Sequence, residues 1–151
     1  MKKLIAFLVV VLLIFSFSRC EKDKEVEDQK FSFYVGTYTD GESEGIYQYN
    51  LDKEGRFSKQ KLVAKTQNPS YLAFSKDKKF LIAVNETNHE GVGGVESYEV
   101  SKDSLICINK VSSGGAHPCF VTVHNNDVYV ANYTGGNLSV ASLGVSNGKL
   151  T

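Results

Sequence analysis

The chain has 151 residues, of which 42% are hydrophobic and 11% aromatic, so it has the length of one ordinary domain and enough apolar material for a core. This composition excludes a chain that is disordered throughout. Its 17 basic residues balance its 17 acidic residues, and no basic run interleaved with aromatic residues appears, which argues against nucleic acid as a partner. Only Arg19 and Arg56 are arginines, so few side chains offer the planar fork that binds phosphate through two bonds.

The N-terminus has the pattern of an export signal. Lys2 and Lys3 precede an apolar run over residues 4–17, which is too short to span a membrane comfortably and has the length of a signal-peptide core. Residues 1–19 are therefore predicted to be a signal peptide. Their removal would leave a mildly acidic mature chain.

A cysteine directly follows this segment. Cys20 begins a charged stretch over residues 20–30, an arrangement that resembles a bacterial lipoprotein, in which a lipidated cysteine precedes a soluble tether. The residue before a lipidated cysteine is usually small, and here it is Arg19, so cleavage at another site and retention as an uncleaved anchor both stay open. We expect an exported protein, periplasmic, on the cell surface or secreted, that meets the membrane only through a lipid anchor.

From residue 31 onward the pattern is all-β, because short runs rich in Val, Ile, Phe, Tyr and Leu are separated by turns rich in Gly, Asn, Asp and Lys. Three segments superimpose without gaps and start 48 and then 47 residues apart: Tyr34-Val-Gly-Thr-Tyr-Thr39, Ile82-Ala-Val-Asn-Glu-Thr87 and Tyr129-Val-Ala-Asn-Tyr-Thr134. A repeat of this length with about four strands is the signature of a β-propeller blade.

The middle repeat predicts one whole blade. From the central channel outward, we expect strands at Ser70–Ser75, Phe80–Glu86, Gly94–Val100 and roughly Leu105–Ser112. The second of these is apolar without alternation, as expected of a strand whose two faces both pack against neighbouring blades. No helix longer than about three turns is expected within residues 31–143.

The repeats on either side are shorter. The first begins at its second strand, over residues 31–37, and the third ends at Gly148-Lys-Leu-Thr151, where its fourth strand should start. Residues 31–151 therefore hold about two and a half blades. Because a propeller has four to eight blades, we expect a fragment that cannot close a ring alone. A short chain that assembles with other copies into rings is the alternative.

The repeat resembles a known family. The run Asn68-Pro-Ser-Tyr-Leu-Ala-Phe-Ser-Lys-Asp-Lys-Lys-Phe-Leu-Ile-Ala-Val-Asn-Glu86 is similar to the repeat signature of the 6-phosphogluconolactonases, as are the segments 34–39 and 130–137. The resemblance implies a seven-bladed propeller that hydrolyses a small-molecule lactone, and a related branch with this fold opens or closes muconate lactones. Since the phosphorylated sugar lactone is made in the cytoplasm, an exported relative is expected to hydrolyse another sugar lactone.

Most polar candidates for chemistry fall on one face of the propeller, because chain direction reverses at each strand and loops alternate between the two faces. Lactone hydrolysis needs a base that deprotonates water and a donor that holds the carbonyl oxygen as it becomes negative. His117 and Glu86 are the candidate bases. Asn85, Asn132 and Tyr133 are the candidate substrate-binding donors.

Each candidate has a structural alternative. An asparagine at the end of a repeated strand is often a turn former whose amide ties adjacent blades together, and this applies to Asn85 and Asn132. His117, next to a proline in a tight loop, is equally well explained as an ordinary loop residue, whereas His124 falls in a hairpin turn on the opposite face. A propeller without catalytic activity that binds a protein or glycan through the same loops is the rival function.

Neither a metal nor a cofactor is expected, since the sequence contains no His-Glu-x-x-His zinc motif and its Gly-rich loop lacks the dinucleotide-binding spacing. We also expect no disulfide between Cys107 and Cys119. The first falls on the outer strand of one blade and the second on the inner strand of the next, whereas a disulfide requires Cα atoms within about 7 Å.

Overall fold

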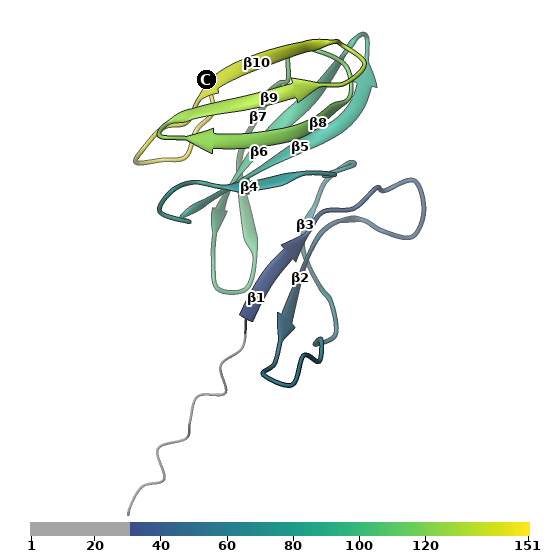
Figure 1. Cartoon of the computed structure of the whole chain (residues 1–151), viewed down its shortest axis with the longest axis vertical. Coiled ribbons are helices and arrows are strands. Elements are labelled where there is room, and N and C mark those ends of the chain that lie inside the picture. Colours follow the sequence, from purple (N-terminus) through teal and green to yellow (C-terminus); the bar gives the residue numbers. More distant parts are fainter. Residues whose placement is uncertain (1–30) are drawn as a thin grey trace, which may run out of the picture.

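The computed structural model describes residues 31–151, which form three antiparallel sheets and contain no helix. The strands are β1 (Phe31–Val35), β2 (Gly45–Leu51), β3 (Lys61–Lys65), β4 (Leu72–Phe74), β5 (Phe80–His89), β6 (Val92–Val100), β7 (Leu105–Ser112), β8 (Pro118–His124), β9 (Asp127–Asn132) and β10 (Asn137–Ser142). The sheet orders are β1-β2-β3, β4-β5-β6-β7 and β10-β9-β8. They stack in chain order as three blades, with the four-stranded sheet in the middle (Figure 1). The predicted all-β blade architecture is confirmed.

The predicted signal peptide over residues 1–19, Cys20 and the tether over residues 20–30 lie outside the described residues. Within residues 31–151, no helix is long and apolar enough to cross a membrane.

The strands of the middle blade match their prediction except at their ends. β7 starts and stops where it was expected, but β4 is shortened to Leu72–Phe74. The segment before β4 is a turn in which Asn68 has a φ of 42° and Pro69 has no N–H for a ladder bond. β5 extends to His89, which pairs with Val92 after an irregularity in the register.

Two apolar layers hold the blades together, and β5 contributes to both. Leu81 and Ala83 lie between the first and second blades, whereas Ile82 and Val84 lie between the second and third. All four are at most 1% exposed. Burying such side chains stabilises the fold by about 1.5–3 kcal/mol for each large one. The unbroken apolar character of this strand therefore reflects two buried faces.

The first blade lies close to the loop before the second blade at Gly36, directly after β1. A β-carbon at this position would lie 1.8 Å from the carbonyl oxygen of Pro69, in the loop before β4. Only glycine fits this contact. The strand that was expected over residues 31–37 ends at Val35.

The third blade lacks most of its fourth strand, as expected. After β10, Leu150 forms a single antiparallel bridge with Leu143. The strand assignment of the two cysteines is also confirmed, since Cys107 lies on β7 and Cys119 on β8, in different sheets. The absence of a disulfide between them stays a prediction.

The outer faces of the first and third blades expose apolar side chains. On the first blade, Phe33 stacks on Tyr49 with ring centroids 5.6 Å apart, and Phe57 packs edge-on against both. On the third blade, Leu138 and Val140 are more than half exposed. These two faces have the composition of the layers that join the blades, but no blade covers them within residues 31–151.

Candidate functional site

Three backbone hydrogen bonds bring the sequence-predicted residues together on one face. The Glu86 N–H donates to the carbonyl of Asn68 (2.9 Å), and the Tyr133 N–H donates to the carbonyl of His117 (2.9 Å). The His117 N–H in turn donates to the carbonyl of Thr87 across the blade boundary (3.0 Å). His117 is thereby fixed beside the end of the segment that carries Glu86.

The backbone at His117 is in an unusual conformation. Its φ is 52°, and it precedes Pro118, although residues before proline favour extended conformations. Asn68, which precedes Pro69 in the previous repeat, has the same feature with a φ of 42°. The left-handed turn is therefore a property of the repeat, and by itself it does not mark His117 as catalytic.

The side chain of His117 has a defined partner. Its Nδ1 lies 2.8 Å from Oγ1 of Thr134, in the loop between β9 and β10. When Thr134 accepts a hydrogen bond from the Nδ1–H group, the lone pair of Nε2 is available to a ligand. A histidine that acts as a general base needs a second group that orients its imidazole, and Thr134 is placed to do this.

Glu86 accepts hydrogen bonds from hydroxyl groups on both sides of the boundary between the first and second blades. Its Oε2 accepts a hydrogen bond from the hydroxyl of Tyr38 at 2.8 Å and another from the hydroxyl of Ser70 at 2.5 Å. The hydrogen bond to Glu86 is the main reason that the pKa of Tyr38 is raised above its ordinary value. The carboxylate is therefore held in one orientation.

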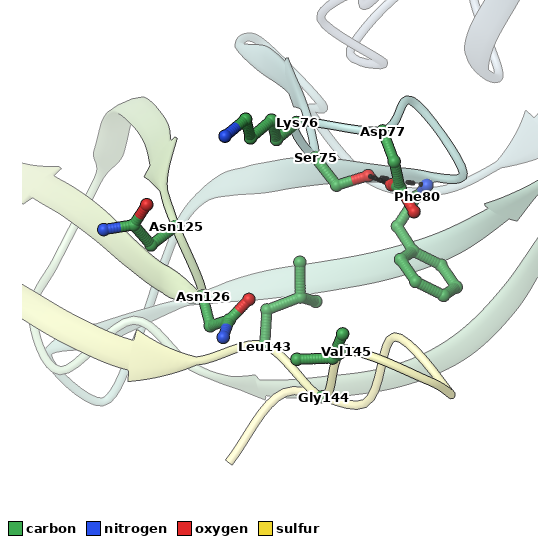
Figure 2. Close-up of a pocket in the computed structure, with 9 residues that line it drawn as sticks. All are labelled: Ser75, Lys76, Asp77, Phe80, Asn125, Asn126, Leu143, Gly144 and Val145. Carbon is green, nitrogen blue, oxygen red and sulfur yellow. Dashed lines mark hydrogen bonds between the residues drawn. The ribbon is translucent and has the colours of Figure 1, made fainter.

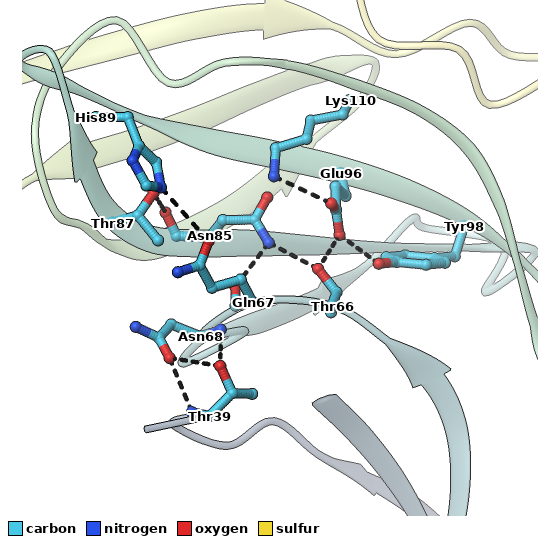
Figure 3. A network of polar contacts seen from close by, with 10 residues as sticks. All are labelled: Thr39, Thr66, Gln67, Asn68, Asn85, Thr87, His89, Glu96, Tyr98 and Lys110. Carbon is cyan, nitrogen blue, oxygen red and sulfur yellow. Dashed lines mark hydrogen bonds and ion pairs between the residues drawn. The ribbon is translucent and has the colours of Figure 1, made fainter. Parts of the chain in front are cut away.

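Asn85 and Asn132 are both buried and are not exposed on this face. Figure 3 shows the contacts of Asn85. Asn85 is completely buried, and its Nδ2 donates to Oγ1 of Thr66 and to the carbonyl of Gln67, both at 2.8 Å. Asn132 is 3% exposed, and its Nδ2 donates to the carbonyl of Ser113 at 2.9 Å and to Oγ of Ser139 at 3.2 Å. This geometry fits the alternative in which both amides tie the loop between two blades to the following blade.

The tie at Asn85 continues into a buried polar network, which Figure 3 shows. Thr66 accepts from Asn85 and donates to Oε2 of Glu96 at 2.5 Å. Glu96 also accepts from the hydroxyl of Tyr98 and pairs with Lys110 at 3.3 Å. Burial, with a further contribution from Glu96, raises the pKa of Tyr98 strongly. The network belongs to the boundary between the first two blades.

Sequence reasoning missed two aromatic residues beside the site. Tyr71 and Phe120 each follow a proline by two residues in successive repeats, and each is 41% exposed. Their ring centroids are 4.8 Å apart. The matched spacing from Pro69 and Pro118 is the signal that could have identified them. Tyr133, by contrast, was predicted, and its ring is 81% exposed on the same face.

A hollow lies at the opposite ends of the strands from this face (Figure 2). It has a volume of about 670 Å³ and is lined by Ser75, Lys76, Asp77, Phe80, Asn125, Asn126, Leu143, Gly144 and Val145. Its lining contains no histidine, and its carboxylate, Asp77, is occupied by the hydroxyl of Ser75 at 2.8 Å. It therefore offers no free base for hydrolysis. Within the described residues, no group of three His, Cys, Asp or Glu side chains is placed to hold a metal ion.

Comparisons with known proteins agree with this architecture. Residues 32–151 match the family model described as "Lactonase, 7-bladed beta-propeller". The chain is 40% identical over 116 residues to the 6-phosphogluconolactonase of Bacillus subtilis, an alignment that covers 74% of this chain and 33% of that protein.

Solved structures give the same result. The periplasmic gluconolactonase of Pseudomonas aeruginosa superimposes with a TM-score of 0.75 at 32% identity, covering 82% of this chain and 37% of that one. A candidate 6-phosphogluconolactonase from Bacteroides fragilis superimposes with a TM-score of 0.76 at 34% identity, covering 85% and 36%. The chain thus spans about a third of the length of these relatives. It belongs to the lactonase family of seven-bladed β-propellers.

Proposed function

We propose that the full-length protein carrying this chain hydrolyses a sugar lactone at the face that holds His117 and Glu86. The names of the Bacillus subtilis and Pseudomonas aeruginosa relatives support a lactonase. The observation that carries the proposal is the orientation of His117, whose Nδ1 is 2.8 Å from Thr134 and whose backbone N–H is fixed to Thr87.

In the proposed reaction His117 acts as the general base. Nε2 takes a proton from water as the oxygen attacks the lactone carbonyl, and the resulting negative oxygen requires a donor, for which the exposed Tyr133 hydroxyl is the candidate. Collapse breaks the ring C–O bond, and the imidazolium returns its proton to the departing alkoxide. One water is consumed and a hydroxy acid is formed. Of the two candidate bases, His117 is favoured because Oε2 of Glu86 already accepts two hydrogen bonds.

We further propose that the protein is exported, with residues 1–19 as signal peptide, Cys20 as the lipidated residue, residues 20–30 as tether and residues 31–151 as the first part of the propeller. The apolar run and the cysteine after it support this proposal, and so does the likeness to a periplasmic protein. The substrate would then be a lactone found outside the cytoplasm.

Replacing His117 in the full-length protein tests the base. His117→Ala and His117→Asn should each lower kcat/KM for a sugar lactone by at least about 100-fold, the smallest usual contribution of a general base. The asparagine variant preserves the left-handed turn, since Asn68 occupies the equivalent position. His124→Ala is the control, because His124 is exposed at the opposite end of β8.

Two results would count against the proposal in different ways. If both His117 variants turned over the lactone as fast as the wild type in a pH-stat assay, this histidine would be an ordinary loop residue. No turnover of any lactone by the wild type, in a panel that includes the phosphorylated sugar lactone and muconate lactone, would favour the binding propeller.

A further inference from the structure

We propose that Glu86, held by Tyr38 and Ser70, is the residue that selects an uncharged polyhydroxy lactone over a phosphorylated one. The inference rests on the proposed function, and it names the substrate class of the same site. It assigns Glu86 to recognition of the sugar hydroxyls, with Tyr38 and Ser70 as positioning residues.

The first observation concerns the hydrogen-bond partners of the two carboxylate oxygens of Glu86. Both hydrogen bonds that Glu86 accepts from side chains within residues 31–151 go to Oε2, from Tyr38 and from Ser70. The same part of the chain supplies no ion-pair partner and no donor for Oε1. One oxygen is therefore fixed by neutral hydroxyls, while the other has no hydrogen-bond partner in this part of the chain. A carboxylate oxygen is an acceptor only, so the ligand group that fits it is an O–H or N–H donor.

The second step is the apolar surface beside it. Ser70, which donates to Glu86, is followed directly by Tyr71, and the Tyr71 ring packs on Phe120 at 4.8 Å. Tyr38, the other donor to Glu86, lies in the loop between β1 and β2 of the first blade, and Phe120 lies on β8 of the third blade. The hydroxyls that hold Glu86 and the partly exposed rings that follow Ser70 along the chain thus come from three neighbouring blades.

Together these groups match a neutral sugar ring. Its hydroxyls donate to carboxylates, and its C–H faces pack on aromatic rings, whereas a phosphate ester carries negative charge that the uncompensated Glu86 repels. A site built to accept a hydroxyl hydrogen bond also discriminates strongly against ligands that leave it unpaired.

The test compares two substrates in the full-length protein: a sugar lactone with and without its phosphate. Glu86→Gln keeps the size of the side chain and removes its charge. We expect it to lower kcat/KM for the unphosphorylated lactone about 10-fold, mainly through KM, and to move the preference toward the phosphorylated lactone by a similar factor. Tyr38→Phe should shift the preference in the same direction by less. Tyr49→Phe, on the outer face of the first blade, is the matched control and should leave the preference unchanged.

The possible failures are distinguishable. If the wild type is active and Glu86→Gln has the same substrate preference, this assignment is overturned and the lactonase proposal stands. The same conclusion follows if the wild type prefers the phosphorylated lactone. Turnover of neither lactone would overturn both. Unchanged thermal unfolding of the Gln variant is required, so that a shift in preference reports recognition and not folding.

Discussion

Asn85 and Asn132 make the same connection at successive blade boundaries. Each stands at the equivalent place in its repeat and donates two hydrogen bonds, one of them to a backbone carbonyl of the loop that precedes its blade. Each also has an Oδ1 that is buried without a hydrogen-bond partner in the described part of the chain. The unpaired oxygen costs free energy. The Nδ2 group of the same side chain offsets this cost, because it donates to a loop carbonyl that would otherwise be buried without a partner.

Removing the Asn85 amide should destabilise the fold. Asn85→Ala leaves the Gln67 carbonyl and the Thr66 hydroxyl without their donor, at an expected cost of about 1–3 kcal/mol in the free energy of unfolding. Urea unfolding followed by circular dichroism measures it. Asn126→Ala, in an exposed turn, is the matched control and should change the free energy by less than about 0.5 kcal/mol. Equal effects of the two substitutions would contradict the proposed tie.

Some contacts of the candidate site follow from repeat register, and others do not. Tyr38 and Glu86 are 48 residues apart, one full repeat, so equivalent positions on neighbouring blades could have been expected to meet. The pairing of His117 with Thr134 could not, because it depends on the left-handed turn before Pro118, which residue types alone do not specify. The inward orientation of the two asparagines was anticipated only as an alternative.

The strands themselves were predictable because their hydrophobic runs are bounded by turn residues. Their ends were less so, since β1 ends at Val35, two residues earlier than expected, and a turn shortens β4. The turn between β4 and β5 shows how local chemistry defines an end. The Ser75 hydroxyl donates to Asp77, and Asp77 also accepts from the Lys79 N–H at 3.2 Å.

Because of Asp77, this turn should make the thermal stability of the fold depend on pH below about 4. The hydrogen bond from Ser75, followed by that from Lys79, lowers the pKa of Asp77 below its ordinary value of 3.8. A lowered folded-state pKa adds stability that is complete above the unfolded value and is lost as pH falls through the folded value. The wild type should therefore unfold at a higher temperature than Asp77→Asn near pH 6, and the difference should shrink as pH falls from about 4 to about 2. A difference in Tm that stays constant over this range would show that the charge of Asp77 plays no part.

At the scale of the whole molecule, the described blades end in two uncovered apolar faces. Phe33, Tyr49 and Phe57 lie on one, and Leu138 and Val140 lie on the other. A site at the channel of a seven-bladed ring draws on loops from several blades, and catalytic groups must be held within about half an ångström. Three stacked blades supply the candidate base His117 and the carboxylate of Glu86 for such a site but leave its other side open.

The 151-residue chain on its own is therefore expected to hydrolyse no lactone above the spontaneous rate, whereas the full-length product is expected to do so. Parallel pH-stat assays at equal molar concentration measure this. Turnover by the short chain would contradict the expectation. Light scattering would then show whether a monomer or a ring of several copies was responsible.

The close approach at Gly36 limits how far these blades can be treated as interchangeable parts. Val84 occupies the equivalent place in the next repeat and fills the following apolar layer, whereas a β-carbon at residue 36 would collide with the Pro69 carbonyl. The two junctions therefore differ in their spacing near the channel. In a propeller engineered by copying the middle blade into the first position, valine would replace Gly36 and would push the first blade away from the Pro69 carbonyl. The loop before β4 would have to be exchanged at the same time to keep the two blades in contact.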